Sequence, residues 1–140
     1  MPALHQDCPL CREDGGELLW RDGYLRAILV DEPDYPGFCR VVLNRHAAEM
    51  SDLVPAERVR LMEAVFAVEQ ALRETLSPDK INLASLGNVV PHLHWHVIPR
   101  FRDDRHFPSP IWAAPVRMQS PPRTLDVQVL ANRIAQRLSA

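Results

Sequence analysis

The sequence predicts an α+β domain whose antiparallel sheet has five strands, with one long helix and a second helix at the C-terminus. Three observations lead to this fold class. Short apolar runs flank a turn at Asp22-Gly23, residues 55–76 carry apolar side chains at steps of three and four, and residues 92–98 alternate polar and apolar side chains. Strands followed by a helix and then by further strands are typical of α+β domains.

The first half of the chain is expected to supply three strands and the long helix. Three apolar runs bounded by turn-forming residues predict strands at 17–21, 25–30 and 39–43. The acidic, proline-containing stretch 31–37 is expected to be a surface loop. Pro55 suits the first turn of the helix expected over 55–76. One face of that helix is lined by Leu61, Val65, Val68 and Leu72.

The second half is expected to supply two strands and the last helix. A fourth strand is expected at residues 80–85, followed by a turn at Gly87-Asn88. The fifth strand is expected over 92–98 and to be closed by Pro99. The chain is then proline-rich and irregular up to Pro122. An amphipathic helix from about residue 124 to the end is indicated by Leu130, Ile134 and Leu138.

Length and composition indicate a single domain over residues 1–140. Hydrophobic residues make up 46% of the chain and charged residues 24%, an ordinary globular balance. The net charge of −2 argues against a broad basic surface, so nucleic acid is not an expected partner. No apolar run approaches the ~20 residues of a membrane span. Residues 1–7 lack the pattern of a signal peptide, and we expect a cytoplasmic protein.

Three of the six histidines, His92, His94 and His96, alternate on one predicted strand and therefore share one face. A solvated sheet face is the simplest explanation, but Thr, Lys or Glu would fill such a face equally well. A metal site is the second explanation, although three ligands on one strand make an open site with no acidic residue to orient the rings. Nucleophilic catalysis is the third, because neutral imidazole attacks phosphorus and its neighbours can donate to phosphate oxygens.

The run His92-Leu93-His94-Trp95-His96-Val97-Ile98 resembles the signature of the histidine triad (HIT) family, in which three histidines alternate with apolar residues and two apolar positions follow. Further matching features are Pro99-Arg100, Gly87-Asn88, Pro36-Gly37, the Asp31 loop and the strand that ends at His46. The resemblance covers about residues 8–100. We take these as the core of one HIT domain, with the proline-rich segment and the last helix at 101–140.

This resemblance implies a HIT-like fold with five antiparallel strands per subunit, and a homodimer in which two subunits form one continuous sheet. It also implies that His94 attacks the α-phosphorus of a nucleotide, while His92 and His96 complete the catalytic set. His96 would donate to a non-bridging oxygen. A backbone carbonyl would hold the second ring nitrogen of His94 and so select its tautomer. Water would clear the nucleotidyl intermediate, and two in-line steps imply retention of configuration at phosphorus.

The resemblance also implies substrate-binding positions. Asp31 matches the residue that holds the ribose hydroxyls, and a carboxylate can accept from both of them. Asn82 matches an amide that contacts phosphate, and Asn88 stands where the family usually has Gln. Two departures remove donors: Val89 replaces a Ser or Thr that can serve the leaving group, and Phe38 replaces a His after Pro-Gly. Asn88 is also one methylene shorter than Gln.

The pair Cys8 and Cys11 has the spacing of metal ligands, but CxxC alone supplies half of a zinc site. Two free thiols are the alternative in a reducing compartment. Some bacterial HIT proteins bind a structural zinc with such a pair, a histidine after the Pro-Gly strand and the first triad histidine. The corresponding residues here are His46 and His92. No cofactor is expected to be required for catalysis.

These features predict a hydrolase acting on a nucleoside phosphoanhydride or phosphoramidate, with a purine nucleotide or dinucleoside polyphosphate as substrate. A nucleotide-binding or adaptor protein with little turnover is the alternative, and loss of the donors at Phe38 and Val89 favours it slightly. A metal-dependent enzyme is a third possibility. Trp112 and the basic residues that follow the histidine strand are weaker candidates, for which packing and a solvated turn are the simpler explanations.

Overall fold

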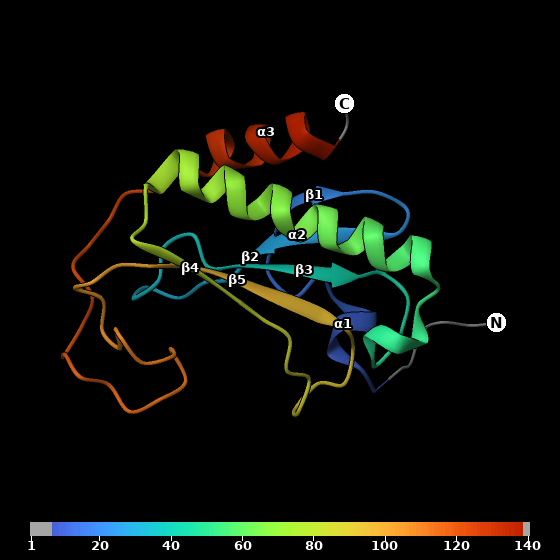
Figure 1. The fold of residues 1–140 in the computed structure, drawn as a ribbon, viewed down its shortest axis with the longest axis horizontal. Coiled ribbons are helices and arrows are strands. Elements are labelled where there is room, and N and C mark those ends of the chain that lie inside the picture. Colours follow the sequence, from blue (N-terminus) through green and yellow to red (C-terminus); the bar gives the residue numbers. More distant parts are fainter. Residues whose placement is uncertain (1–6, 139–140) are drawn as a thin grey trace.

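Five strands form one antiparallel sheet in the order β1-β2-β3-β5-β4 in the computed structural model of the chain, which describes residues 7–138 (Figure 1). The strands are β1 Glu17–Arg21, β2 Leu25–Leu29, β3 Cys39–Leu43, β4 Lys80–Ala84 and β5 His94–Arg100. The helices are α1 Pro9–Arg12, α2 Pro55–Leu76 and α3 Val127–Leu138, with a 3-10 turn η1 at Met50–Asp52. The α+β class and the five-stranded sheet expected from the sequence are therefore confirmed.

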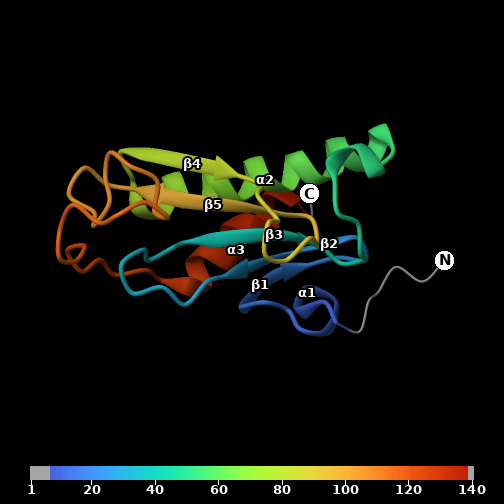
Figure 2. The ribbon, with the colours of Figure 1, turned by 90° about the horizontal axis from the view of Figure 1, so that it is seen from below.

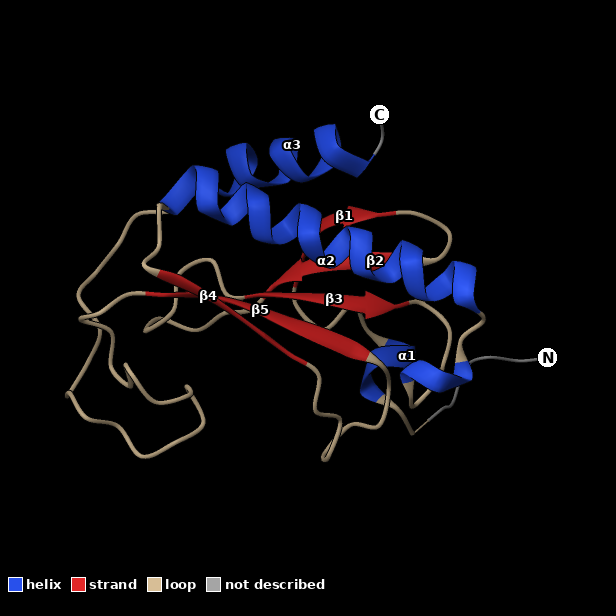
Figure 3. Ribbon diagram, in the orientation of Figure 1, coloured by secondary structure: helices blue, strands red, loops and turns tan. Residues whose placement is uncertain are grey.

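The two long helices cover one face of the sheet (Figures 1 and 3), and the view from below shows the strands in front of both helices (Figure 2). The main hydrophobic core lies between these layers. The opposite face carries α1 near one end of β5 and residues 101–120 near the other end. None of the helices within residues 7–138 has the length and apolar character needed to cross a membrane.

Helix α2 has the bounds that its apolar periodicity predicts. Its four predicted core side chains, Leu61, Val65, Val68 and Leu72, are fully buried. Glu57 accepts a hydrogen bond from the Val54 backbone N–H, which satisfies a free donor at the helix start. The helix ends at Leu76, and the Ser77 N–H still donates to the Arg73 carbonyl, while the positive φ of 49° at Ser77 turns the chain out of the helix.

Gly37 shows why the loop between β2 and β3 requires a glycine. Its φ is +90°, and an added Cβ would lie 2.6 Å from Leu76 Cδ1 and 3.3 Å from Pro99 Cγ. A larger residue would be strained at this φ and would require the Leu76 side chain to move. The Pro36-Gly37 pair therefore fixes how closely this loop approaches α2, and it places the following strand, β3, against β5.

Some expected bounds were wrong: β2 and β4 each end one residue earlier than expected, at Leu29 and Ala84, and larger differences occur at the fifth strand and the last helix. The fifth strand begins at His94 rather than His92, because the His92 N–H turns back to the Val90 carbonyl. It continues through Pro99 to Arg100, since Pro99 pairs with Ile81 of β4 beyond the last pairing with β3. The C-terminal helix starts at Val127, where Asp126 accepts from the N–H of its first turn. Its expected end lies outside the described residues.

Candidate functional site

His94 and His96 lie side by side on β5, on the sheet face opposite α2. Their ring centroids are 5.0 Å apart and their planes are nearly perpendicular. Both rings are more than nine-tenths buried. The neighbouring strand β3 places Val42 beside His94 and Arg40 beside His96. The alternation of β5 therefore presents two adjacent imidazoles, with one cation from the next strand.

The orientation of His94 is set by the backbone of His92. The Nδ1 atom of His94 lies 2.6 Å from the His92 carbonyl oxygen, so Nδ1 carries the proton and donates it. The Nε2 atom then has its lone pair free, as nucleophilic attack requires. Burial lowers the pKa of His94, the hydrogen bond to His92 opposes this, and the charge of Arg40 lowers it further.

His96 is surrounded by Arg40, Phe38 and Trp112. The Arg40 Nε donates to His96 Nδ1 over 3.3 Å, which leaves the proton of the neutral ring on Nε2. The Phe38 and Trp112 rings lie 5.7 Å and 5.0 Å from the His96 ring. Burial, then the His94 ring and then Arg40 lower the pKa of His96 to about 4. His96 is therefore a neutral N–H donor at pH 7.

A surface groove opens beside His94. It has a volume of about 520 Å³ and runs from the start of β5 to the loop after β4 and the 3-10 turn. Its lining includes Ser85, Leu86, Gly87 and Met50. The Ser85 hydroxyl donates to the His94 carbonyl over 2.9 Å, which ties this loop to β5. The groove therefore gives access from the surface to the His94 side of the site.

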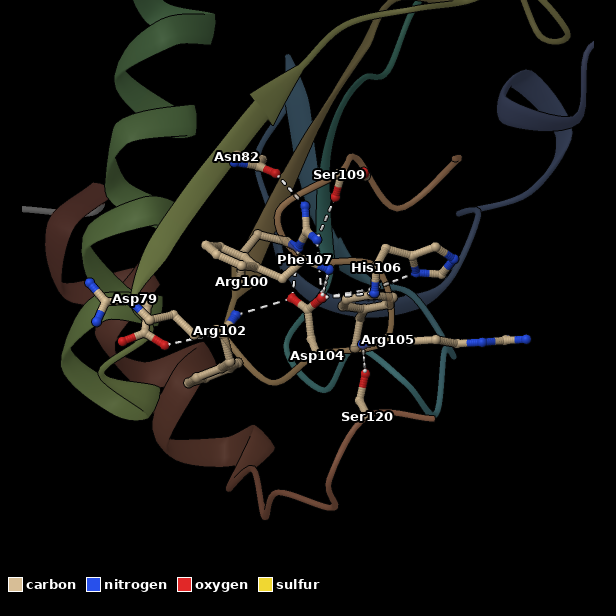
Figure 4. Close-up of polar contacts among 12 residues, drawn as sticks. Asp79, Asn82, Arg100, Arg102, Asp104, Arg105, His106, Phe107, Ser109 and Ser120 are labelled. Carbon is tan, nitrogen blue, oxygen red and sulfur yellow. Dashed lines mark hydrogen bonds and ion pairs between the residues drawn. The ribbon is translucent and has the colours of Figure 1, made fainter. Parts of the chain in front are cut away.

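Residues 101–120 are held against the sheet by a buried ion pair (Figure 4). The Arg100 guanidinium donates to both carboxylate oxygens of Asp104, at 2.8 and 3.0 Å, and both side chains are almost fully buried. Asp104 also accepts the backbone N–H groups of Phe101, His106 and Phe107. Arg100 and His106 are thus buried anchors. A solvated turn was the simpler explanation for the basic residues that follow the histidine strand, and it is wrong for these two.

Because this segment is anchored, its later part lies close to the histidines and places Trp112 beside His96. The loop that begins at Phe101 returns across the end of the sheet, where Ile111 packs on Phe38 and Tyr35. Trp112 then meets His96 while half of its surface remains exposed. The loop therefore forms one wall of the site within the same chain.

The remaining predicted binding residues are spread more widely. Asp31 is exposed and lines a groove with Glu17 of β1 and with Leu125. Asn82 lies on β4, where its Oδ1 accepts from Arg100 over 2.7 Å. Asn88 is exposed in the loop before β5. Within residues 7–138, none of the three hydrogen-bonds to a histidine ring, so their roles with a nucleotide stay predictions.

Cys8, Cys11, His46 and His92 form a compact group at the other end of β5. Their ligand atoms all lie within 4.8 Å of one another. His92 Nδ1 is 3.3 Å from Cys8 Sγ and 3.4 Å from Cys11 Sγ, and His46 Nδ1 is 3.4 Å from Cys11 Sγ. Tetrahedral bonds of about 2.3 Å to sulfur and 2.0–2.1 Å to nitrogen place such atoms about 3.5 Å apart. The donor set and its spacing therefore fit zinc.

The orientation of this group is fixed from both sides. His92 Nε2 donates to the Leu43 carbonyl over 2.6 Å, which leaves Nδ1 to face the cysteines. The buried Arg26 donates to the backbone carbonyls of Leu10, Glu13 and Asp14, and so holds α1 and its cysteines against the sheet. His92 thus points Nδ1 at the cysteines while it also borders the groove, His94 lines the groove, and His96 meets Trp112.

The sequence did not identify Arg40 as a site residue, and it gave Trp112 only as a weaker candidate. Arg40 has the same side-chain parity on β3 as Phe38 and Val42, so it shares their face of the sheet. That signal was available. The pairing of Arg40 with His96 could not be predicted from the sequence, because strand register depends on contacts between distant segments.

Comparison with known proteins agrees with this geometry. The chain matches the family model described as HIT domain over residues 12–103. It is 30% identical over 95 residues to the asymmetrical bis(5'-nucleosyl)-tetraphosphatase of Schizosaccharomyces pombe, which covers 64% of this chain and 52% of that protein. It is 27% identical over 107 residues to the AP-4-A phosphorylase of Mycobacterium tuberculosis, which covers 72% and 55%.

The chain spans about half the length of these curated relatives. Among solved structures, a histidine triad protein from Bradyrhizobium japonicum superimposes with a TM-score of 0.72 at 27% identity, covering 96% of each chain. The family model spans the sheet, the long helix and all three triad histidines. The chain therefore belongs to the HIT domain family.

Proposed function

We propose that this protein hydrolyses a nucleoside phosphoanhydride, with a dinucleoside polyphosphate as the favoured substrate. The observation that carries the proposal is the orientation of His94, whose Nδ1 donates to the His92 carbonyl and whose Nε2 faces away from that bond. The two curated relatives act on dinucleoside tetraphosphates by their names, which supports the substrate class. A phosphoramidate is the second substrate class that the same chemistry serves.

The first step is an in-line displacement at the α-phosphorus. His94 Nε2 forms a bond to phosphorus while the bond to the bridging oxygen breaks, and the polyphosphate departs with the electron pair. His96 donates from Nε2 to a non-bridging oxygen, where negative charge develops. Val89 is exposed at the position of the family's Ser or Thr, so water or the substrate supplies the proton of a basic leaving group.

The second step releases the nucleotide. Water attacks the nucleotidyl-His94 phosphorus from the side that the leaving group vacated, the bond to Nε2 breaks, and a nucleoside monophosphate is formed. The relative named as a phosphorylase favours a second candidate, in which inorganic phosphate replaces water and a nucleoside diphosphate is formed. The two reactions share His94 and differ only in the acceptor.

We also propose that Cys8, Cys11, His46 and His92 hold a structural zinc. Their spacing supports this, as does the absence of a free coordination position pointing into the groove beside His94, since all four ligand atoms come from the protein. The metal would tie α1 to the start of β5 and fix the His92 backbone, whose carbonyl orients His94. It would act on structure, and no catalytic step passes through it.

A homodimer with one continuous sheet is the proposed assembly. The edge strand β4 supports it, because it is regular and carries Leu83 with 36% of its surface exposed, followed by Leu86 with 52% exposed. The other edge strand, β1, has an irregular register between Leu18 and Trp20, which disfavours pairing with another strand.

Release of AMP from diadenosine tetraphosphate tests the proposed function directly. Wild-type protein and the His94→Ala variant are incubated with the substrate, and products are followed by chromatography. We expect the variant to lose several orders of magnitude in rate, because covalent catalysis has no other nucleophile. Addition of inorganic phosphate separates the two candidates, since phosphorolysis yields ADP. Nucleotide binding without turnover by wild type would favour a binding or adaptor role, and equal rates would remove His94 from its role.

A further inference from the structure

Arg40 is a half-buried cation that has no anionic partner in the described part of the chain. Its one hydrogen bond within residues 7–138 runs from Nε to His96 Nδ1. None of the ion pairs in that part of the chain includes it. Burial alone lowers its pKa, with no carboxylate opposing the shift. Four of the five guanidinium N–H groups are therefore available.

This situation is unusual for a buried arginine in this chain. Arg100 is paired with Asp104, and Arg26 donates to three backbone carbonyls. A cation withdrawn from water without a partner destabilises the folded protein, so such a charge indicates an anionic ligand. The Phe38 ring beneath the guanidinium, 5.5 Å from its carbon, restricts the directions that the free N–H groups can take.

The position of Arg40 identifies which group that ligand offers. It pairs with His96 across β3 and β5, and His94 is the next residue on the same face. Phe38 and Trp112, which also pack on His96, carry no charge, so Arg40 is the cation that this ring meets within residues 7–138. A planar fork of N–H groups suits two oxygens of one phosphate.

We propose that Arg40 binds the non-bridging oxygens of the phosphate that His94 attacks, together with the Nε2–H of His96. The proposal rests on the nucleotidyl transfer proposed above and adds a specific phosphate-binding residue to it. Arg40 contacts the ligand in the ground state and holds the charge that develops during attack.

The test measures binding, so that it does not depend on turnover. Calorimetric titrations with AMP, adenosine and inorganic pyrophosphate compare wild type, Arg40→Gln and Arg40→Lys. The control is Arg133→Gln on α3, which removes the same charge from the far layer. We expect Arg40→Gln to bind AMP about 10- to 100-fold more weakly, because a charge-assisted hydrogen bond is lost. Arg40→Lys should recover part of this loss, and adenosine binding should be unchanged.

A second comparison separates contact from positioning. Arg40 also touches His96, so its removal could act only through that ring. In the His96→Gln background, Arg40→Gln should still weaken AMP binding by a similar factor if Arg40 contacts phosphate itself. Equal AMP affinity of the single His96→Gln variant and the double variant would overturn the proposal, and so would wild-type AMP affinity in Arg40→Gln.

The outcomes also distinguish failure of the proposed function. If no substrate is hydrolysed but pyrophosphate binding depends on Arg40, the phosphate site stands and the hydrolase function fails. If AMP is released normally and Arg40→Gln binds AMP and pyrophosphate as wild type does, the hydrolase function stands and the role of Arg40 fails. If wild type binds neither AMP nor pyrophosphate, the role of Arg40 is overturned, and AMP release alone decides the hydrolase function.

Discussion

The tautomers of the two site histidines are determined by groups in direct contact with their rings. The His92 carbonyl selects the tautomer of His94, and the Arg40 guanidinium selects that of His96. One ring thereby exposes a lone pair and the other an N–H donor. Two identical side chains on one strand thus present different ring atoms, as the proposed roles of nucleophile and donor require, because of one backbone oxygen and one cation.

The pKa of His96 leads to a pH-dependent stability. Its value is about 4 in the folded chain, against 6.5 for an ordinary histidine. Between these values the unfolded chain binds a proton that the folded chain does not, so stability is lost as the pH falls through this range. We expect the free energy of unfolding to fall by about 2 kcal/mol more in wild type than in His96→Gln between pH 7 and pH 5.

Urea denaturation at the two pH values measures this difference. Taking wild type minus variant removes contributions shared by both proteins, such as protonation of the metal-binding group. The groups that face His96 are His94, Arg40, Phe38 and Trp112, and all four remain in the variant. The same pH dependence in both proteins would contradict the neutral, buried state of His96.

At this scale the sequence predicted much of the site. The triad alternation identified His94 and His96. The CxxC spacing gave two of the metal-binding residues and the family resemblance gave His46 and His92, and the structure brings all four together. Arg40 could not be found in this way, because an arginine on a strand carries no sign of which strand lies beside it. Its significance arises from register and from the lack of a carboxylate nearby.

Among the elements, α1 has four residues and cannot be stable by itself. Arg26 and the proposed zinc hold it to the sheet. We expect purified wild type to contain about one zinc per chain and a chelator to lower its melting temperature, because metal binding is coupled to folding. Cys11→Ser should lose zinc and melt near the temperature of the chelated protein.

The control for the metal prediction is Cys39→Ala. Cys39 is fully buried on β3, burial strongly raises the pKa of its thiol, and it lies outside the metal-binding group. This variant should keep its zinc and should still respond to the chelator. Metal content from mass spectrometry and melting curves give both readouts. A chelator that removes zinc without changing the melting temperature would contradict a structural role.

Residues 101–120 depend on Asp104. Although burial alone would raise it, Arg100 and the N–H groups of Phe101 and Phe107 lower the pKa of Asp104 to about 2. Asp104→Ala leaves Arg100 buried without a partner, and we expect it to cost about 3–5 kcal/mol of folding free energy. Proteases should then cleave within this segment. Asp103→Ala, at an exposed ion pair with Arg123, should change stability by less than about 1 kcal/mol.

Denaturation and limited proteolysis of both variants test this prediction. Equal stability of Asp104→Ala and Asp103→Ala would show that the buried pair does not anchor the segment.

The sequence predicted α2 closely, because long apolar periodicity is a strong local signal. It could not predict the course of residues 101–120, since nothing in the local pattern shows that Asp104 is buried, accepts from its neighbours Arg100 and Phe107, and is also reached by the distant Tyr35 hydroxyl.

At the scale of the whole molecule, the proposed homodimer can be tested with two matched substitutions, one on each edge strand of the sheet. We expect light scattering after size exclusion to give a dimer for wild type. Leu83→Asp on β4 should give a monomer, because a charge on the pairing edge opposes strand addition. Leu18→Asp on β1, which is 44% exposed, should remain a dimer. Monomeric wild type, or dissociation by the Leu18 variant alone, would contradict pairing through β4.

The stereochemical course at phosphorus tests the central claim most directly. A dinucleoside polyphosphate carrying a chiral phosphorothioate at the attacked phosphorus is hydrolysed in oxygen-labelled water, and the configuration of the product is determined. Attack by His94 followed by attack of water inverts the centre twice, so the account predicts net retention. Net inversion would mean a single direct attack by water and would contradict a covalent intermediate on His94.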